Sequence, residues 1–142
     1  MDEPGGHSKV IVIFLEFSRH VSITEKTVNY IDIFVSSVPT ANRALYLEHA
    51  KATTAIFKSH GALKVLECWG DDVPDGKLTS LPMAVKREAD ETVVFSSVAW
   101  PSREARDEGM KKFMADPRLE SISMPFDGKR VIFGGFQTVV EA

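Results

Sequence analysis

The sequence predicts an α+β fold of the ferredoxin-like class, a βαββαβ sandwich in which two helices cover one face of an antiparallel sheet. Three observations predict it. From residue 28 onward the chain has two halves with the same plan: a strand, a proline followed by a hydroxyl residue, a helix and a second strand. An Asp-Gly-Lys turn recurs in each half, at 75–77 and at 127–129. The chain of 142 residues is also long enough to bury one core without cross-links.

The first half begins with a strand at 28–38, where β-branched and aromatic residues dominate. Pro39 ends this strand, and the hydroxyl of Thr40 is placed to cap a helix that runs to about His60. Gly61 predicts the end of that helix, because glycine readily adopts the left-handed conformation that follows a last helical turn. A second strand then spans 62–69.

The second half repeats this order with a strand at 92–100 and with Ser102 as the cap of a helix that runs to about residue 115. The pair Asp116-Pro117 ends this helix, and the last strand spans 130–140. Gly109 lies in the middle of the helix, where glycine costs about 1 kcal/mol relative to alanine. We therefore expect the helix backbone to approach the sheet closely at Gly109.

Residues 1–27 form an N-terminal extension outside this plan, and 28–142 form a single ferredoxin-like domain. The extension holds an apolar run at 10–17, which is far shorter than the ~20 residues needed to span a bilayer. It also lacks the features of a signal peptide. Two interpretations stay open: the run is an extra strand that covers a sheet edge or joins a partner, or the extension arises from an upstream start codon and is not essential to the fold.

Charge and cysteine content exclude several classes of protein. Lys and Arg number 17 against 20 Asp and Glu, which gives a net charge of −3 and a pI near 5.8. Nucleic-acid-binding domains normally carry a basic surplus, so we expect no nucleic-acid partner. Cys68 is the single cysteine, cannot form an internal disulfide and is typical of a reducing compartment. The sequence thus predicts a cytoplasmic protein without a membrane partner.

Apolar residues on both faces of the predicted strands indicate a homodimer. A sheet with one face in water should alternate apolar and polar residues, but the runs at 93–95 and 131–133 are continuously apolar. Two helices cover one face only, and the helix that ends near His60 has apolar stripes on two sides. We therefore expect a second copy of the chain to pack sheet against sheet. The alternative cover is the N-terminal apolar run or the long loop that follows residue 70.

Two carboxylates in predicted strands are candidates for catalysis. Glu67 and Trp69 alternate with Cys68, so they share one face of their strand. If both sheet faces are covered, the Glu67 carboxyl is shielded, has a raised pKa and suits general acid or base work. Asp32, in the middle of the first strand, would be its partner if both point into one cavity. The alternative for each is a structural carboxylate.

The stretch 71–91 is long for a loop in a compact domain, and we interpret it as a lid or binding loop that an extra strand around 83–86 would shorten. The candidate ligand-binding residues are those that could line a pocket beneath it: Trp69, Cys68, Asp71, Asp72, Trp100, Met110, Met114, Phe126 and Arg130. Core packing is the alternative for the apolar ones, and a solvated surface for the charged ones. Gly134-Gly135 inside the last strand indicates a bulge or a ligand that approaches the backbone.

A series of ordered blocks runs through the chain: HGAL at 60–63, ECWGDDVPDGK at 67–77, ETVVFS at 91–96, WPS at 100–102, GMKK at 109–112, DPR at 116–118 and MPFDGKR at 124–130. These blocks resemble the YbaA-like family of small bacterial proteins over about residues 30–142. Members usually begin near the position of Tyr30, so the extension lies outside the family pattern. The resemblance implies a dimeric ferredoxin-like (α/β-barrel) fold. It implies no established activity and no agreed catalytic residue.

Three functions are compatible with these expectations. The first is a homodimeric small-molecule-binding protein with a pocket between sheet and helices. The second is a cofactor-free enzyme of the dimeric α/β-barrel type, a monooxygenase, isomerase or decarboxylase that uses a shielded carboxylate, an analogy at the level of fold. The third is a structural or interaction protein without a pocket. We expect no metal and no cofactor, because the four histidines lack the paired spacing of a metal site.

Overall fold

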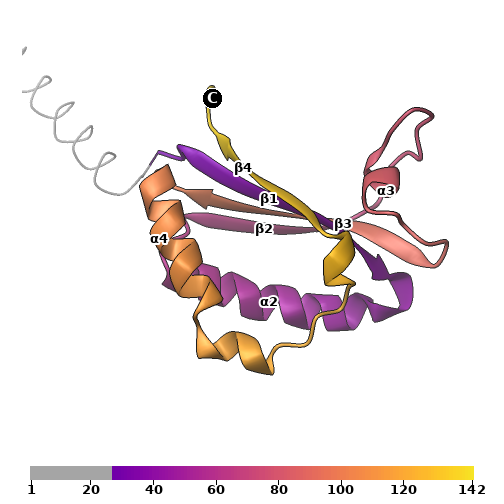
Figure 1. Cartoon of the computed structure of the whole chain (residues 1–142), viewed down its shortest axis with the longest axis horizontal. Helices are drawn as coiled ribbons and strands as arrows, with labels where there is room; N and C mark the ends of the chain where they lie inside the picture. The colour runs from indigo at the N-terminus through magenta and orange to yellow at the C-terminus, as the bar shows by residue number, and fades with distance from the viewer. Residues whose placement is uncertain (1–26) are drawn as a thin grey trace, which may run out of the picture.

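The computed structural model describes residues 27–142, so the predicted strand at 10–17 lies outside the described residues. The main elements follow the predicted order βαββαβ (Figure 1): β1 (Tyr30–Pro39), α2 (Arg43–Ser59), β2 (Lys64–Trp69), β3 (Glu91–Trp100), α4 (Arg103–Met114) and β4 (Ile132–Gln137). The connections contain a short helix α3 (Leu81–Ala84) and three 3-10 helices, η1 (Thr40–Asn42), η2 (Pro117–Ser121) and η3 (Gly128–Arg130). Helix α3 thus stands where the sequence predicted a short strand.

The four strands form one sheet in the order β2-β3-β1-β4, with every neighbouring pair antiparallel. The central pair is aligned over its full length, from Tyr30 opposite Trp100 to Pro39 opposite Glu91. Both long helices lie on the same face of the sheet (Figure 1). This strand order with helices on one face confirms the ferredoxin-like α+β fold. Within the described chain the sheet is open, with β2 and β4 at its edges.

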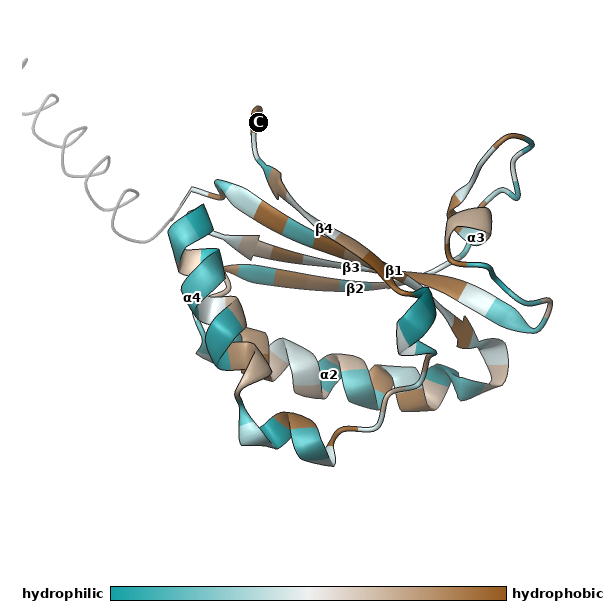
Figure 2. Cartoon of the chain, viewed as in Figure 1, coloured by the Kyte–Doolittle hydropathy of each residue, from teal (hydrophilic) through white to brown (hydrophobic). Residues whose placement is uncertain are grey.

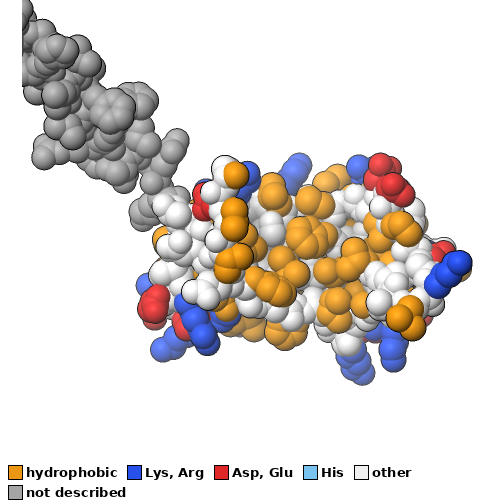
Figure 3. Space-filling model, turned by 90° about the horizontal axis from the view of Figure 1, so that it is seen from above, with side chains coloured by type: hydrophobic (Ala, Val, Ile, Leu, Met, Phe, Trp, Pro, Cys, Tyr) orange, Lys and Arg blue, Asp and Glu red, His pale blue; other side chains and the backbone are white. Residues whose placement is uncertain are grey.

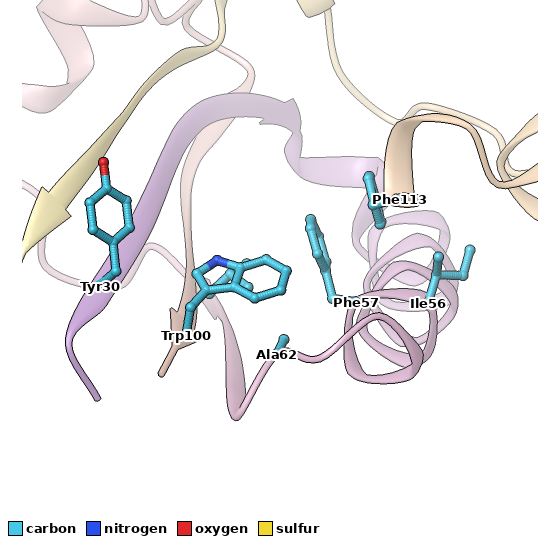
Figure 4. Close-up of a cluster of buried hydrophobic side chains, with 7 residues drawn as sticks. Tyr30, Ile56, Phe57, Ala62, Trp100 and Phe113 are labelled. Atoms are coloured by element: carbon cyan, nitrogen blue, oxygen red, sulfur yellow. The ribbon is translucent and has the colours of Figure 1, made fainter. Parts of the chain in front are cut away.

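The core lies between the sheet and the two helices. Even-numbered residues of β1 and β3 point toward the helices, among them Val98 and Trp100, which are fully buried. Phe57 of α2 stacks on Phe113 of α4 with ring centroids 3.8 Å apart, and its ring meets the Trp100 ring edge-on at 6.3 Å (Figure 4). Burying a side chain of this size contributes roughly 1.5–3 kcal/mol, so these aromatic contacts hold the helices to the sheet.

The helix ends show which capping predictions were right. Ser102 caps α4 as predicted, because its hydroxyl accepts a hydrogen bond from the Ala105 amide at 3.0 Å. Gly61 follows α2 with φ +103, as predicted for a helix end. The prediction for Thr40 is wrong, since its hydroxyl shares a hydrogen bond with Thr92 on β3 at 2.7 Å and α2 begins three residues later. The last strand is also shorter than predicted, because Arg130 belongs to η3.

Helix α2 is buried on one side only. Its buried residues are Tyr46, Ala50, Thr53, Ile56 and Phe57, which lie on one side of the helix, at spacings of three or four residues. Leu45 and Leu47, which flank this side on its two edges, are exposed. Within the described chain, one side of this helix is therefore covered, although the sequence has apolar stripes on two sides. Figure 2 shows the resulting mixture of hydrophobic and hydrophilic residues along α2.

The outer face of the sheet, on the side away from α2 and α4, carries a broad hydrophobic surface (Figure 3). The odd-numbered residues of β1 and β3 point to this face, among them Ile33 and Phe95, which are partly exposed. One end of the face is covered by Val85, which is fully buried against Val35 and Val93. The loop after β2 thus packs on the outer face, and the prediction that it closes over a pocket between sheet and helices is wrong.

Candidate functional site

Glu67 lies on the helix-facing side of β2, opposite Ser96 of β3. The Tyr46 hydroxyl of α2 donates a hydrogen bond to Glu67 Oε2 at 2.9 Å, and the Ser96 hydroxyl donates to the same oxygen. Burial raises the pKa of the Glu67 carboxyl, and the two hydrogen bonds only partly counteract this effect. Burial and the nearby Glu67 charge also raise the pKa of Tyr46, so its hydroxyl stays a donor. The group is chemically suited to hold or transfer a proton.

Trp69 lies beside this group, with its ring centroid 5.5 Å from that of Tyr46. The Arg43 guanidinium carbon is 5.5 Å from the centroid of the Trp69 ring, a cation–π geometry. Glu67 and Trp69 therefore share a face as predicted, and Cys68 is exposed on the opposite face.

Asp32 forms a second buried group, with only 6% of the residue exposed. Trp100 Nε1 donates a hydrogen bond to Asp32 Oδ2 at 3.0 Å, and Arg106 Nε of α4 lies 3.4 Å from Oδ1. Burial raises the pKa of Asp32, and the Arg106 charge opposes that rise. Arg106 also donates to the Tyr30 hydroxyl at 2.7 Å, with its guanidinium carbon 4.7 Å from the ring centroid.

Glu67 and Asp32 point to the same face of the sheet but belong to separate groups. Glu67 lies opposite Ser96, whereas Asp32 lies opposite Val98 on the other side of β3. Strand spacing and rise place their Cα atoms roughly 12 Å apart. Their hydrogen-bond partners differ, so an acid–base pair between these two carboxylates is not assembled.

The predicted ligand-binding residues are dispersed over the molecule. Trp100 and Met110 lie in the main core, Trp69 and Phe126 pack around Tyr46, Asp71, Asp72 and Met114 are exposed, and Cys68 is on the outer face. Arg130 holds the Glu91 carboxylate with two parallel hydrogen bonds of 2.6 and 2.7 Å. These bonds lower the pKa of Glu91. The guanidinium is thus occupied by a carboxylate of the same chain.

A cavity of about 570 Å³ lies where the start of β1, the end of β4 and the first turn of α4 meet. Its lining consists of Asn29, Tyr30, Ser102, Arg103, Glu104, Gly135, Gln137 and Thr138. Gly135 leaves the room that the Tyr30–Arg106 contact occupies, since a Cβ there would lie 2.7 Å from Tyr30 Cε1. The glycine pair in β4 is the only feature of the sequence that pointed to this cavity. The lining residues come from three segments, around residues 29, 103 and 137, which lie together only in the folded chain.

Residues 27–142 offer neither a metal site nor a membrane-spanning helix. This part of the chain contains no group of three or more His, Cys, Asp or Glu side chains arranged to hold a metal ion. None of its helices combines the length and apolar character that a membrane span requires.

Replacing Glu67 by glutamine is expected to change the pH dependence of stability. A carboxyl whose pKa is raised on folding stabilises the folded protein most below its ordinary pKa of 4.5, and this contribution is lost as pH rises through the folded pKa. The free energy of unfolding of wild type minus that of Glu67→Gln should therefore decrease as the pH rises from 4 to 8. Urea denaturation at each pH measures this difference. The exposed Glu120→Gln is the control. A difference that does not vary with pH would show that Glu67 is not shielded.

The fold and these groups define the protein as a ferredoxin-like α+β domain with two buried carboxylates on the helix-facing side of its sheet. It belongs to the family described as "Protein of unknown function (DUF1428)", whose model matches residues 29–128. The chain is 49% identical over 114 residues to the uncharacterized protein YbaA of Escherichia coli (strain K12), which amounts to 79% of this chain and 97% of that protein. YbaA of Shigella flexneri matches equally. The resemblance to the YbaA-like family is thereby confirmed.

Two solved structures are also similar to the chain. One is a dimeric ferredoxin-like protein from an uncultured marine organism, with a TM-score of 0.48 and 12% identity over 82% of this chain and 100% of that one. The other is a nipsnap family protein with unknown function from Agrobacterium tumefaciens, with a TM-score of 0.46 and 17% identity over 80% of this chain and 91% of that one. The fold assignment itself depends on the strand order and helix placement described above.

Proposed function

We propose that the protein is a cytoplasmic homodimer that binds a small polar molecule. The observation that carries the proposal is the cavity between the sheet and α4. Its volume of about 570 Å³ lies within the range of small-molecule sites. Asn29 Nδ2 already donates to the Pro101 carbonyl oxygen at 2.9 Å. The Asn29 amide oxygen and the Gln137 amide at the border of the cavity can still pair with a ligand, so the ligand class is one with several hydrogen-bonding groups.

Tyr30, one of the residues that line the cavity, is held in place by a chain of contacts. The Tyr30 hydroxyl accepts a hydrogen bond from Arg106, whose guanidinium is in turn paired with the buried Asp32. Trp100 holds the other oxygen of that carboxylate. A site whose side chains are fixed before binding loses less entropy when the ligand enters, which supports a binding role for this corner of the molecule.

The hydrophobic outer face supports the homodimer. Ile33 and Phe95 at its centre and Leu66 and Phe136 toward its edges keep part of their apolar surface exposed. Monomeric soluble proteins rarely leave a contiguous apolar patch of this kind uncovered. A second copy related by a two-fold axis would cover it with an identical face.

The proposal is tested on the full chain, purified from its own host without denaturation. Light scattering should give twice the 15.7 kDa of one chain, and native mass spectrometry should detect a co-purified small molecule. Gly135→Ala displaces Tyr30 and Arg106 and should reduce the bound fraction at least tenfold. Gly128→Ala, whose added Cβ meets only Met124 Cε at 3.4 Å, is the matched control. A dimer that never carries a ligand would favour a purely structural or interaction protein.

The alternative function is a cofactor-free enzyme, and the Glu67 group is the observation that favours it. A carboxyl with a raised pKa, held by two hydroxyl donors, has the properties of a general acid or base. An activity that Glu67→Gln abolishes, while the protein stays folded and dimeric, would support this alternative. An activity that survives the substitution would exclude Glu67 as the catalytic group.

A further inference from the structure

The loop between β2 and β3, residues 70–90 with α3 at its centre, forms an arm that stands on the outer face of the sheet (Figure 1). Its base is attached at several points. Val85 is fully buried against Val35 and Val93, and the Gly70 amide donates to the Val93 carbonyl oxygen at 2.8 Å. The Ser80 hydroxyl caps α3 by accepting from the Met83 amide at 3.1 Å. The arm is therefore an ordered part of the fold.

An ion-pair clamp also holds the end of the arm. Arg130 binds both oxygens of Glu91 and donates to the Lys86 carbonyl oxygen at 3.0 Å. Arg87 donates to the Glu91 carbonyl oxygen at 2.9 Å. Arg130 of η3 thus holds the arm at Lys86, and Arg87 of the arm is bound to the first residue of β3. These contacts fix the direction in which the arm projects.

The outer part of the arm exposes apolar side chains despite this rigid support. Leu78 is 96% exposed, Leu81 is 47% exposed, and Met83 is also exposed. A fixed display of large apolar side chains is typical of a protein–protein contact. Because Val85 rests on the outer face, these side chains lie on the same side of the sheet as the apolar surface around Phe95.

We propose that the arm of each subunit packs against the partner subunit, so that Leu78 and Leu81 belong to the dimer interface. This inference rests on the proposed homodimer. A second copy seated on the outer face must lie beside the arm, because both occupy that face. The central strands pair over ten residues and the two edge pairings span six, so the outer face measures only roughly 500 Å² in projection. Val85 already covers one end of it, whereas a standard interface buries about 800 Å² of accessible surface on each partner. The arm would add apolar surface to the interface beyond what the sheet face alone provides.

Sedimentation equilibrium of the full chain and its variants tests the inference. Leu78→Asp and Leu81→Asp should each raise the dimer dissociation constant at least tenfold. Leu47→Asp on α2 is the matched control, because Leu47 is 46% exposed on the helix side, and it should leave the constant unchanged. Leu78 is almost fully exposed, so its replacement should not disturb the fold of one subunit, which circular dichroism checks.

Ile33→Asp in the centre of the outer face separates the two proposals. If Ile33→Asp dissociates the dimer but neither arm variant weakens it, the inference about the arm is wrong and the sheet-to-sheet dimer stands. If the unmodified chain sediments as a monomer, or Ile33→Asp leaves a dimer intact, the proposed sheet-to-sheet dimer itself is wrong. Both proposals are supported if Leu78→Asp, Leu81→Asp and Ile33→Asp each weaken the dimer while Leu47→Asp leaves the dissociation constant unchanged.

Discussion

Replacing Gly109 by alanine is expected to lower the free energy of unfolding by about 3 kcal/mol, the upper part of the range for overpacked cores. A Cβ at this position would lie 2.6 Å from both the His60 carbonyl oxygen and Trp100 Cη2. The carbonyl belongs to the backbone and Trp100 is fully buried, so neither neighbour can move without shifting α2 or β3. Urea denaturation followed by circular dichroism measures the loss.

The sign of this effect is decisive. In an unobstructed helix, alanine stabilises by about 1 kcal/mol relative to glycine, so a more stable Gly109→Ala would show that α4 does not touch Trp100. Adding Trp100→Phe to Gly109→Ala removes one of the two obstructing groups. The double variant should therefore lose less free energy of unfolding than the two single variants lose in sum.

Replacing Glu91 by glutamine is expected to cost about 2 kcal/mol, because it weakens two charge-assisted hydrogen bonds from Arg130, while the Asp127 carboxylate, 3.3 Å from Arg130 Nε, still partly balances the guanidinium. Only 4% of the Glu91 side chain is exposed, and Arg130 contacts both carboxylate oxygens. The exposed Glu48→Gln on α2 is the control and should change the free energy of unfolding by less than about 0.5 kcal/mol.

The loss should also depend on pH. The hydrogen bonds from Arg130 hold the pKa of Glu91 below its ordinary value of 4.5. A carboxyl of this kind contributes its full stability above the ordinary pKa and loses it as pH falls through the folded pKa. The difference between wild type and Glu91→Gln should therefore be largest near neutral pH and shrink in acid. A difference that grows on acidification would contradict the clamp.

Local signals in the sequence predicted most of the fold. Ser102 and Gly61 end their helices as expected, because a cap and a left-handed glycine act within a few residues of the helix they terminate. Thr40 offered the same local signal and failed, since its hydroxyl bonds to Thr92, which lies in the other half of the chain. A local pattern does not reveal a competing partner that only the folded sheet brings near.

The candidate site was predicted less completely for the same reason. Strand alternation predicted that Glu67 shares a face with Trp69, but the partners of Glu67, Tyr46 and Ser96, depend on where α2 lies and on the register between β2 and β3. Whether Asp32 lies near Glu67 likewise depends on the registers of β1 and β2 with β3, which no local pattern in the sequence reveals. Arg130 is among the predicted ligand-binding residues, and no nearby residue in the sequence indicates that its guanidinium is bound to Glu91.

The pairing of β1 with β4 has a consequence for how the chain folds. Tyr30 pairs with Gln137, about 100 residues later, and the central pair β1–β3 also joins distant segments. Contacts between residues so far apart in sequence slow folding, because the connecting chain must be closed into a large loop before they form. During synthesis, β1 is completed long before either of its neighbours leaves the ribosome. Its apolar residues therefore stay open to aggregation until β3 and β4 are available to pair with it.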